Sequence, residues 1–365
     1  MSIKKTEFKI ELVLLLCFVF LFFRALPEVK EDRKEENVQQ EQQTNAGKKD
    51  EQTSGSLLVV EYATGDDALI NKEAMEVRIP TPTGIPTSAP TVIPAPTYAL
   101  PPDESISVAD LAGEKYTMEK LKDLTYLKEN LYIVNATTKM TEAEFDAEYF
   151  ISKDLSIEKA EEHQILIFHT HASEAFSDSR AGVEEDTIRG VGELLAKTLR
   201  EKYGYSVLHD TTVFDMKDGK DNRNYAYNDA LKYLKQLLEE YPSIEVIIDL
   251  HRDAGAKRVT TINGKQTAKV MLFNGLCRNT KGKLTYLPND YLKDNLAFSF
   301  QMKLIGDELY PGLMNRIFLK DYRYNMHLTE RFLLVELGTE QNTVEEAKNA
   351  MEPLADILAQ VLGTE

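Results

Sequence analysis

Two alternating patterns of apolar residues run through the second half of the chain. Short runs of branched and aromatic residues, typical of buried strands, are separated by longer segments whose apolar residues recur every three or four positions, as on one face of a helix. Strands that alternate with helices predict an α/β fold, with a mostly parallel sheet covered by helices on both faces. The expected strands cover residues 164–168, 205–210, 244–250, 269–273 and 331–337, and the expected helices cover residues 187–204, 227–242, 289–311 and 344–362.

Residues that cap or stop helices support these boundaries. Gly204 follows the first expected helix and can adopt the left-handed conformation in which many helices end. Pro242 stops the second helix because it lacks the backbone N–H that a helix interior needs. Thr343 and Glu346 have the spacing of a capping box, which predicts that the last helix begins at residue 344.

The N-terminal part of the chain follows a different pattern. The run from Leu12 to Phe23 carries no charge, and with its flanking residues it approaches the ~20 apolar residues that a membrane helix needs. Lys4 and Lys5 precede the run, as in exported proteins, and no small-residue cleavage site follows it. We therefore expect residues 1–27 to form an uncleaved, single-pass anchor in the cell membrane, with the rest of the chain outside the cytoplasm. A cleaved signal peptide and a buried helix are the alternatives.

Residues 28–104 have a composition that cannot form a core. A charged, Gln-rich stretch is followed by one rich in Pro and Thr, which predicts a disordered linker with extended polyproline segments. We expect this linker to hold a catalytic head away from the membrane. Weak apolar periodicity returns in residues 105–162, which are expected to form a small helical lead-in, and residues 163–365 are expected to form the catalytic α/β domain.

Net charge and cysteine content exclude several classes of function. The chain carries 43 Lys and Arg residues against 60 Asp and Glu residues, a formal net charge of −17, which argues against binding to nucleic acid. Two cysteines are too few for a disulfide framework or a Cys-rich zinc ribbon. Any contact with an anionic wall polymer must therefore be made by a local site, since overall charge opposes it.

Histidines and glutamates stand where three of the expected strands end. His171 and Glu174 follow the first expected strand, and His251 follows the third. Glu336 lies near the end of the last strand. In open α/β sheets, ligands and catalytic groups gather at the carboxyl ends of strands. Two histidines and one carboxylate form an open Zn²⁺ site that keeps one position for water, so His171, Glu174 and His251 are the expected metal ligands.

Two neighbouring residues compete for these roles. His169 lies two positions before His171, and alternate residues of an extended chain share a face, so His169 is an alternative ligand or a neighbour of the ligands. Glu185, at the start of the following helix, is an alternative to Glu174. The sequence leaves both choices open.

Three further residues have expected roles around the metal. Glu336 is a carboxylate within an apolar strand, where burial raises the pKa toward the range of a general base for amide hydrolysis. Asp249 stands two residues before His251 and is expected to orient its imidazole. Arg252 is a weaker candidate for stabilising an oxyanion, because a surface ion pair is the more common role of such a residue.

Several stretches of the second half resemble a known family. The stretch "VELGTEQNTVEEAK" is similar to the last part of the zinc N-acetylmuramoyl-L-alanine amidases of bacterial cell-wall turnover, where a strand, a catalytic Glu, a Gly and an Asn precede a helix. "IIDLHRDAG" resembles their second zinc-histidine strand, and the His-x-x-Glu start is also similar to that of zinc carboxypeptidases. "ILIFHTHASEAF", "GVGELLAKTL", "VIIDLHRDAG" and "YPGLMNRI" look more specifically like the stage II sporulation protein P family of membrane-anchored amidases.

This resemblance implies a substrate and a setting. The substrate would be peptidoglycan, cut at the amide between N-acetylmuramic acid and L-alanine, with Zn²⁺ as cofactor and Glu336 as base. The setting would be engulfment of the forespore, on the mother-cell side of the septum, alongside the stage II sporulation proteins D and M. Family members also cut within the peptide stem or its cross-bridge, which gives a second expected activity. A zinc carboxypeptidase that trims stem peptides and a non-catalytic wall-binding module are the alternatives.

Overall fold

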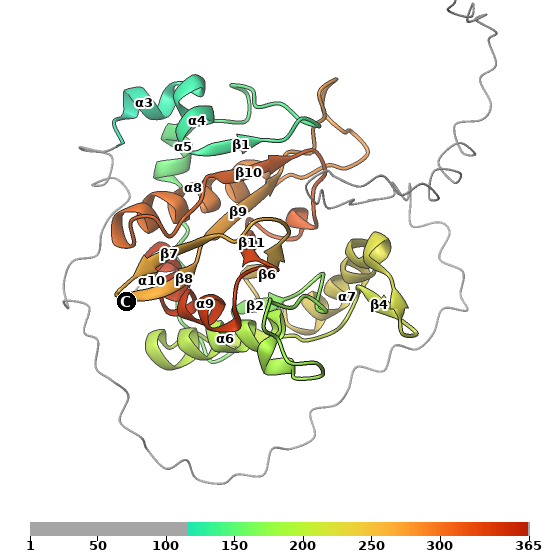
Figure 1. Ribbon diagram of the computed structural model, residues 1–365. Coiled ribbons are helices and arrows are strands. Elements are labelled where there is room, and N and C mark those ends of the chain that lie inside the picture. The colour runs from blue at the N-terminus through green and yellow to red at the C-terminus, as the bar shows by residue number, and fades with distance from the viewer. Residues whose placement is uncertain (1–115, 364–365) are drawn as a thin grey trace, which may run out of the picture. The chain divides into compact units, whose positions relative to one another are not determined.

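The computed structural model of the protein describes residues 116–363 (Figure 1). The expected anchor over residues 1–27, the expected linker over residues 28–104 and the first part of the 105–162 lead-in lie outside the described residues. Within residues 116–363, no helix combines the length and the apolarity that crossing a membrane requires.

A seven-stranded sheet organises the described residues. Its strands are β1 Tyr132–Val134, β2 Ile165–Phe168, β3 Val207–His209, β6 Val246–Asp253, β9 Val270–Gly275, β10 Ile317–Lys320 and β11 Arg331–Thr339. In space they follow the order β1-β10-β9-β11-β6-β2-β3 (Figure 1), and neighbours are parallel except for β9 and β11. The expected mostly parallel sheet is therefore mixed, with two parallel groups that run in opposite directions.

This reversal brings strand ends from both groups to one edge of the sheet. Because β9 is antiparallel to β11, with Val270 opposite Leu337, the amino end of β9 lies beside the carboxyl end of β11. Glu336 is opposite Met271 in that pairing and opposite His251 in the parallel pairing of β11 with β6. The edge at which β2, β6 and β11 end therefore continues onto β9.

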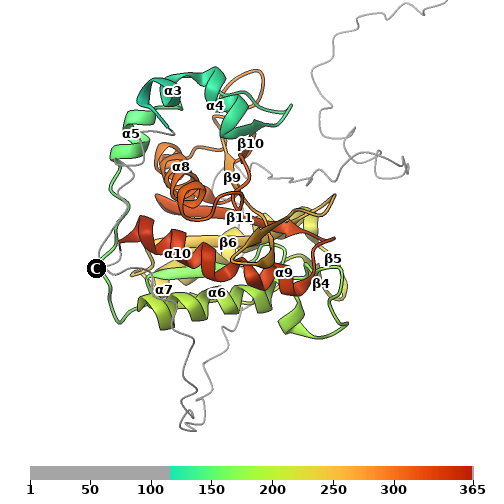
Figure 2. The ribbon, with the colours of Figure 1, turned by 60° about the vertical axis from the view of Figure 1, so that its left-hand side comes forward.

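Helices cover both faces of the sheet, as the alternation of elements predicts. Ile167 of β2 belongs to a larger apolar core, whereas Leu166 and Phe168 belong to a smaller one, because successive side chains of a strand point to opposite faces. The long helices of the larger core are α6 Ile188–Tyr203, α8 Leu292–Leu309 and α10 Met351–Leu362, and the helix of the smaller core is α7 Ala226–Glu240. On the larger core, α10 lies between α6 and α8 (Figure 2).

The expected signals at helix ends are confirmed. Gly204 ends α6 in the left-handed conformation, with φ of 73°. Helix α7 ends at Glu240, two residues before Pro242. Both hydrogen bonds of the capping box form, since the Thr343 side chain accepts from the N–H of Glu346 and the Glu346 side chain accepts from the N–H of Thr343.

The C-terminal helix differs from the prediction. Instead of one helix over residues 344–362, the chain forms α9 Val344–Asn349 and then α10, with Ala350 between them. Pro353 has no backbone N–H to give to the carbonyl of Asn349, four residues earlier, so the hydrogen-bond ladder is interrupted at this point. The apolar periodicity continues across the break, which is why the sequence pattern does not reveal it.

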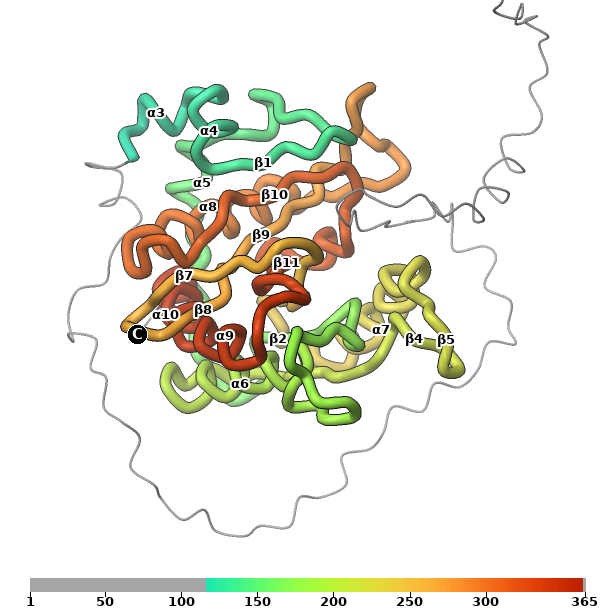
Figure 3. Tube along the Cα trace, in the orientation of Figure 1, coloured from blue at the N-terminus to red at the C-terminus, as the bar shows by residue number. Residues whose placement is uncertain are grey.

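Several short helices and strands are not predicted by the apolar pattern of the sequence. The lead-in forms helices, as expected, and also supplies β1, the edge strand that pairs with β10 (the trace in Figure 3 shows this pairing). Strands and hairpin arms of two to four residues are too short to show a period. The remaining elements are α3 Met118–Lys122, α4 Leu124–Asn130, α5 Ala147–Ser152, η2 Glu184–Asp186, β4 Met216–Lys217, β5 Lys220–Asp221, η3 Arg223–Tyr225, β7 Val259–Ile262, β8 Lys265–Ala268 and η4 Met326–Leu328.

Gly338 lies at an irregularity of β11 that follows Glu336, where the register with β6 shifts. Its φ is 59°, in the left-handed region that favours glycine. A Cβ at this position would lie 2.6 Å from Oδ1 of Asn342. The Asn342 amide cannot easily move away, because it accepts from the N–H of Thr339 and donates to the carbonyl of Arg258. Only glycine fits this position of β11 without strain.

We expect Gly338→Ala to lower the free energy of unfolding by about 2–5 kcal/mol. A left-handed φ costs a residue with a Cβ about 1–2 kcal/mol, and the contact with Asn342 adds an overpacking cost of about 1–3 kcal/mol. Gly264→Ala is the matched control, because Gly264 has φ of 78° but nothing within 4 Å of its Cβ position. Chemical denaturation measures both variants. Equal losses would show that the contact with Asn342 contributes nothing.

Candidate metal centre

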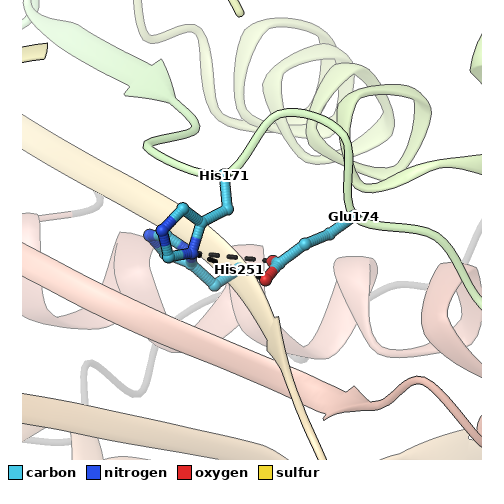
Figure 4. A group of neighbouring side chains, drawn as sticks. All are labelled: His171, Glu174 and His251. Carbon is cyan, nitrogen blue, oxygen red and sulfur yellow. Dashed lines mark ion pairs between the residues drawn. The ribbon is translucent and has the colours of Figure 1, made fainter. Parts of the chain in front are cut away.

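Three side chains from two parts of the fold meet at the edge where β2 and β6 end (Figure 4). His171 and Glu174 lie on the loop after β2, and His251 lies in β6. Their ligand atoms all lie within 4.8 Å of one another. Nδ1 of His171 is 3.6 Å from Oε1 of Glu174, and Nδ1 of His251 is 3.6 Å from Oε2 of the same residue. Two imidazoles therefore approach one carboxylate.

This cluster is buried and its ring nitrogens are not satisfied. His171 is 2% exposed, and Glu174 and His251 are each 1% exposed. Nδ1 of each histidine has no hydrogen-bond partner among the described residues. Buried polar atoms are normally paired, so two such nitrogens beside a carboxylate indicate a site that a cation can satisfy. Imidazole nitrogen and carboxylate oxygen are donors that Zn²⁺ takes in proteins, and these three residues fit that ion.

Asp249 holds the far side of the His251 ring. Its Oδ1 lies 2.7 Å from Nε2 of His251, close enough for an ion pair although not aligned as a hydrogen bond. Thr170 donates to the same carboxylate with its N–H at 2.8 Å and its hydroxyl at 2.6 Å. Burial lowers the pKa of His251, but the charges of Asp249 and Glu174 outweigh it and raise the pKa well above its ordinary value. Asp249 therefore lies where the sequence predicts an orienting residue.

Glu174 is fixed by donors on both sides. The backbone N–H of Arg252 donates to its Oε2 at 2.9 Å. The guanidinium groups of Arg223 and Arg252 lie 3.7 and 3.9 Å from its Oε1. Burial raises the pKa of Glu174, but its interactions with His171 and His251 outweigh burial and hold the pKa below its ordinary value. The carboxyl is therefore ionised, which is the form that binds a metal.

Tyr227 of α7 forms the apolar wall of the cluster. Its ring centroid lies 5.7 Å from that of His171, nearly perpendicular, and 6.4 Å from that of His251, with only 13° between the planes. One buried ring thus packs against both imidazoles and limits their rotation. Sequence reasoning missed Tyr227, as well as Arg223 of η3, because a position within or just before an amphipathic helix carries no signal of contact with distant histidines.

Glu336 faces the same region from β11. It is the register partner of His251, so both side chains lie on the α7 face of the sheet. Glu336 is 6% exposed, and its Oε2 has no hydrogen-bond partner among the described residues. Burial raises the pKa of Glu336 to about 8; the charge of His251 opposes this rise, and the carboxylates of Asp253 and Glu174 add to it. A buried carboxyl with a pKa near neutrality suits a proton acceptor.

The alternative ligands lie elsewhere. His169 points to the opposite face, against α6, where its Nδ1 is 2.8 Å from the carbonyl oxygen of Leu250 and its Nε2 is 3.0 Å from Nε2 of His209. The argument from alternation does not hold, because β2 ends at Phe168 and the chain then turns. Glu185 is exposed on η2 and is not part of the cluster.

The Arg252 side chain stabilises the loop that carries His171 and Glu174. Its Nε donates to the carbonyl of Ala175 at 3.0 Å. Its side chain is 16% exposed, whereas that of Arg223 is 37% exposed. Of these two guanidinium groups, Arg223 is therefore the more accessible to a ligand, and Arg252 has mainly a positioning contact.

Solved amidase structures resemble this fold at low similarity. An N-acetylmuramoyl-L-alanine amidase from Clostridium difficile 630 is 14% identical, with 55% of this chain and 95% of that chain covered and a TM-score of 0.32. The CwlD amidase from Clostridioides difficile, solved in complex with the GerS lipoprotein, is 16% identical, with 55% of this chain and 96% of that chain covered and a TM-score of 0.31. Likeness at this level carries no information on activity.

Sequence similarity is more specific. The stage II sporulation protein P of Bacillus subtilis (strain 168) is 28% identical over 214 residues, which cover 54% of this chain and 50% of that protein. The chain thus spans about half the length of the curated relative that it matches. Residues 24–359 match the family model of stage II sporulation protein P (SpoIIP). Because this match covers most of the sequence, the chain belongs to the stage II sporulation protein P family.

Proposed function

We propose that this chain is a zinc-dependent N-acetylmuramoyl-L-alanine amidase that cuts peptidoglycan during engulfment of the forespore. The observation that carries the proposal is the buried cluster of His171, Glu174 and His251, with Glu336 in register beside it. Membership of the stage II sporulation protein P family supports the sporulation setting.

The cluster would hold the metal, and its neighbours would hold the cluster. His171, Glu174 and His251 would supply two imidazole nitrogens and one carboxylate, the donor set of hydrolytic zinc sites that also take a water. When bound, zinc supplies Lewis-acid polarisation of the amide carbonyl and lowers the pKa of water. Asp249 would keep the His251 ring in one orientation, and the N–H of Arg252 would do the same for the Glu174 carboxylate.

Glu336 would move the protons of the reaction. Its Oε2 is free to accept a proton from the attacking water and to pass it to the leaving amine nitrogen. The pKa of about 8 is that of Glu336 when only the charges of the protein act on its carboxyl. A divalent cation beside Glu336 would lower that pKa, because a nearby opposite charge favours the carboxylate. Glu336 would then be ionised near neutral pH, as a base must be.

Digestion of purified peptidoglycan tests the reaction. We expect the full chain with zinc to release stem peptides with a free amino group on L-alanine, and a chelator to abolish this release. Mass spectrometry of the products identifies the bond that is cut. Release of single C-terminal amino acids would instead support a zinc carboxypeptidase, and cut cross-links would add the endopeptidase activity. Absence of any product would favour a non-catalytic wall-binding module.

We expect Glu336→Gln to lose at least about a hundredfold in amidase activity, because glutamine cannot accept a proton and general base catalysis is worth ~10²–10⁴-fold. Zinc content should stay at the wild-type value, since glutamine is nearly isosteric and Glu336 is not in the ligand cluster. Glu185→Gln is the matched control and should retain activity, because Glu185 is exposed outside the cluster. Loss of zinc would make Glu336 a ligand, and retained activity would place the base elsewhere.

The proposed location is the cell membrane facing the septal wall, on the mother-cell side, with residues 1–27 as the anchor. The uncharged run in that segment, without a cleavage signature, supports the proposal. We expect N-terminal sequencing of the protein from sporulating cells to find a start before Leu26; a start after Leu26 would mean that the segment is removed. The stage II sporulation proteins D and M are the proposed partners, to be tested by co-purification from detergent-solubilised membranes.

A further inference from the structure

A cavity opens along the same edge of the sheet as the candidate metal centre. Its volume is about 560 Å³, within the range of about 300–1,000 Å³ that small-ligand sites occupy. Asp253, Met271 and Arg316 line it, together with Arg258 and Phe318. These residues come from β6, β9 and β10 and the segments beside them; β9 and β10 are neighbours in the sheet, and β11 lies between β9 and β6 (Figure 1).

This cavity begins next to Glu336. Met271 of the cavity wall is the register partner of Glu336 in the pairing of β9 with β11. Asp253 lies two residues after His251, and its charge is one of those that raise the pKa of Glu336. Phe318 lies on β10, the next strand after β9. The cavity and the candidate metal centre are therefore neighbouring parts of one continuous edge.

The charges in the cavity leave one cation without a counter-charge. Arg258 pairs with Asp253 at 2.6 Å, and Lys303 of the lining pairs with Asp307 at 2.5 Å. Arg316 is exposed and, within the described part of the chain, has no carboxylate at ion-pair distance. In a chain with a net charge of −17, such a local positive site is the kind that attracts an anionic ligand.

Arg316 is also held in place. Its Nη1 donates to the main-chain carbonyls of Lys128, Glu129 and Tyr132, at 3.2, 3.1 and 3.5 Å. These bonds use one nitrogen of the guanidinium and leave the others for a ligand. The carbonyls belong to the end of α4 and the start of β1, so the lead-in segment positions this arginine. A pre-oriented guanidinium can bind a carboxylate with two hydrogen bonds.

We propose that this cavity binds an acidic residue of the substrate peptide, with Arg316 as the group that recognises its carboxylate. The proposal rests on the proposed amidase function. Neighbouring strands are about 4.8 Å apart, so β10 lies about 10 Å from β11 and Glu336. An extended peptide advances ~3.3–3.6 Å per residue. A peptide that leaves the cut bond along this edge therefore reaches Arg316 with its second or third residue.

The apolar part of the wall fits the same ligand. Met271 and Phe318 present a thioether and an aromatic ring beside the arginine, and such surfaces can cover the aliphatic stem of an acidic side chain. The muramic acid side of the bond is a neutral sugar derivative, whereas the peptide side carries carboxylates. Charge complementarity therefore directs the peptide, and not the glycan, toward the cavity.

Binding of two matched ligands tests the proposal. The probes are the γ-methylamides of N-acetylmuramyl-L-alanyl-D-glutamate (the acid) and of N-acetylmuramyl-L-alanyl-D-isoglutamine (the amide), which differ only in the α-carboxylate and hence by one charge. Titration calorimetry is carried out with the zinc-loaded full chain carrying Glu336→Gln, so that neither probe is cut. We expect the acid to bind about tenfold more tightly than the amide, as for one hydrogen-bonded charge pair. Equal binding of the two probes would overturn the proposal.

Variants of the cavity separate recognition from folding. Arg316→Gln should remove the preference for the acid, whereas Arg316→Lys should retain most of it, because the charge remains although the bonds to α4 are weakened. Arg200→Gln, at a half-buried arginine of α6 that pairs with Glu193 and does not line the cavity, should leave the preference unchanged. The proposal would be contradicted if the Arg316→Gln variant still preferred the acid. It would also be contradicted if Arg316→Lys reduced the preference as much as Arg316→Gln does. An intact preference without peptidoglycan cleavage would refute the amidase function and leave the cavity assignment standing.

Discussion

The pairing of β6 with β11 is the constraint on which the candidate site depends. Its parallel register puts Glu336 opposite His251, and the two-residue period of a strand sends both side chains, with Asp249, to the α7 face. Leu333 and Val335 face the larger core on the other side and hold β11 in that register. A shift of one residue would turn Glu336 into this core and bring apolar side chains to the cluster of His171, Glu174 and His251.

Burial of several charges in one place sets the roles of the carboxylates. Removing an ion from water costs several kcal/mol unless partners replace the solvent. Glu174 has such partners in two imidazoles and the N–H of Arg252, so its pKa stays low and it is suited to binding a cation. Glu336 has no comparable partner for its Oε2, so burial raises its pKa to about 8. The same strand ends thus provide an ionised carboxylate, the candidate ligand, and a second carboxyl of raised pKa, the candidate proton acceptor.

Patterns along the sequence predicted most of the helices and central strands, and the placement of polar residues at strand ends predicted which ligands meet. The pattern could not choose between two nearby histidines, because that choice depends on the turn that follows Phe168, the end of β2. Alternation places His169 on the α6 face, opposite Phe168, and the turn brings His171 to the α7 face instead. Tyr227 reaches the site through the rotation of α7 against the sheet, a tertiary contact without a local signal. The reversal of β9 likewise follows from long-range pairing. The Asn263–Gly264 pair, in contrast, is a sequence signal for a hairpin, and it forms the turn between β7 and β8.

X-ray diffraction from zinc-soaked crystals of the protein, recorded on both sides of the zinc absorption edge, tests the central claim most directly. The account predicts one anomalous peak in contact with Nδ1 of His171, Nδ1 of His251 and the carboxylate of Glu174, with Glu336 nearby but not bound to the ion. A peak between His169 and His209, or no peak at the cluster at zinc concentrations that saturate other zinc hydrolases, would contradict it.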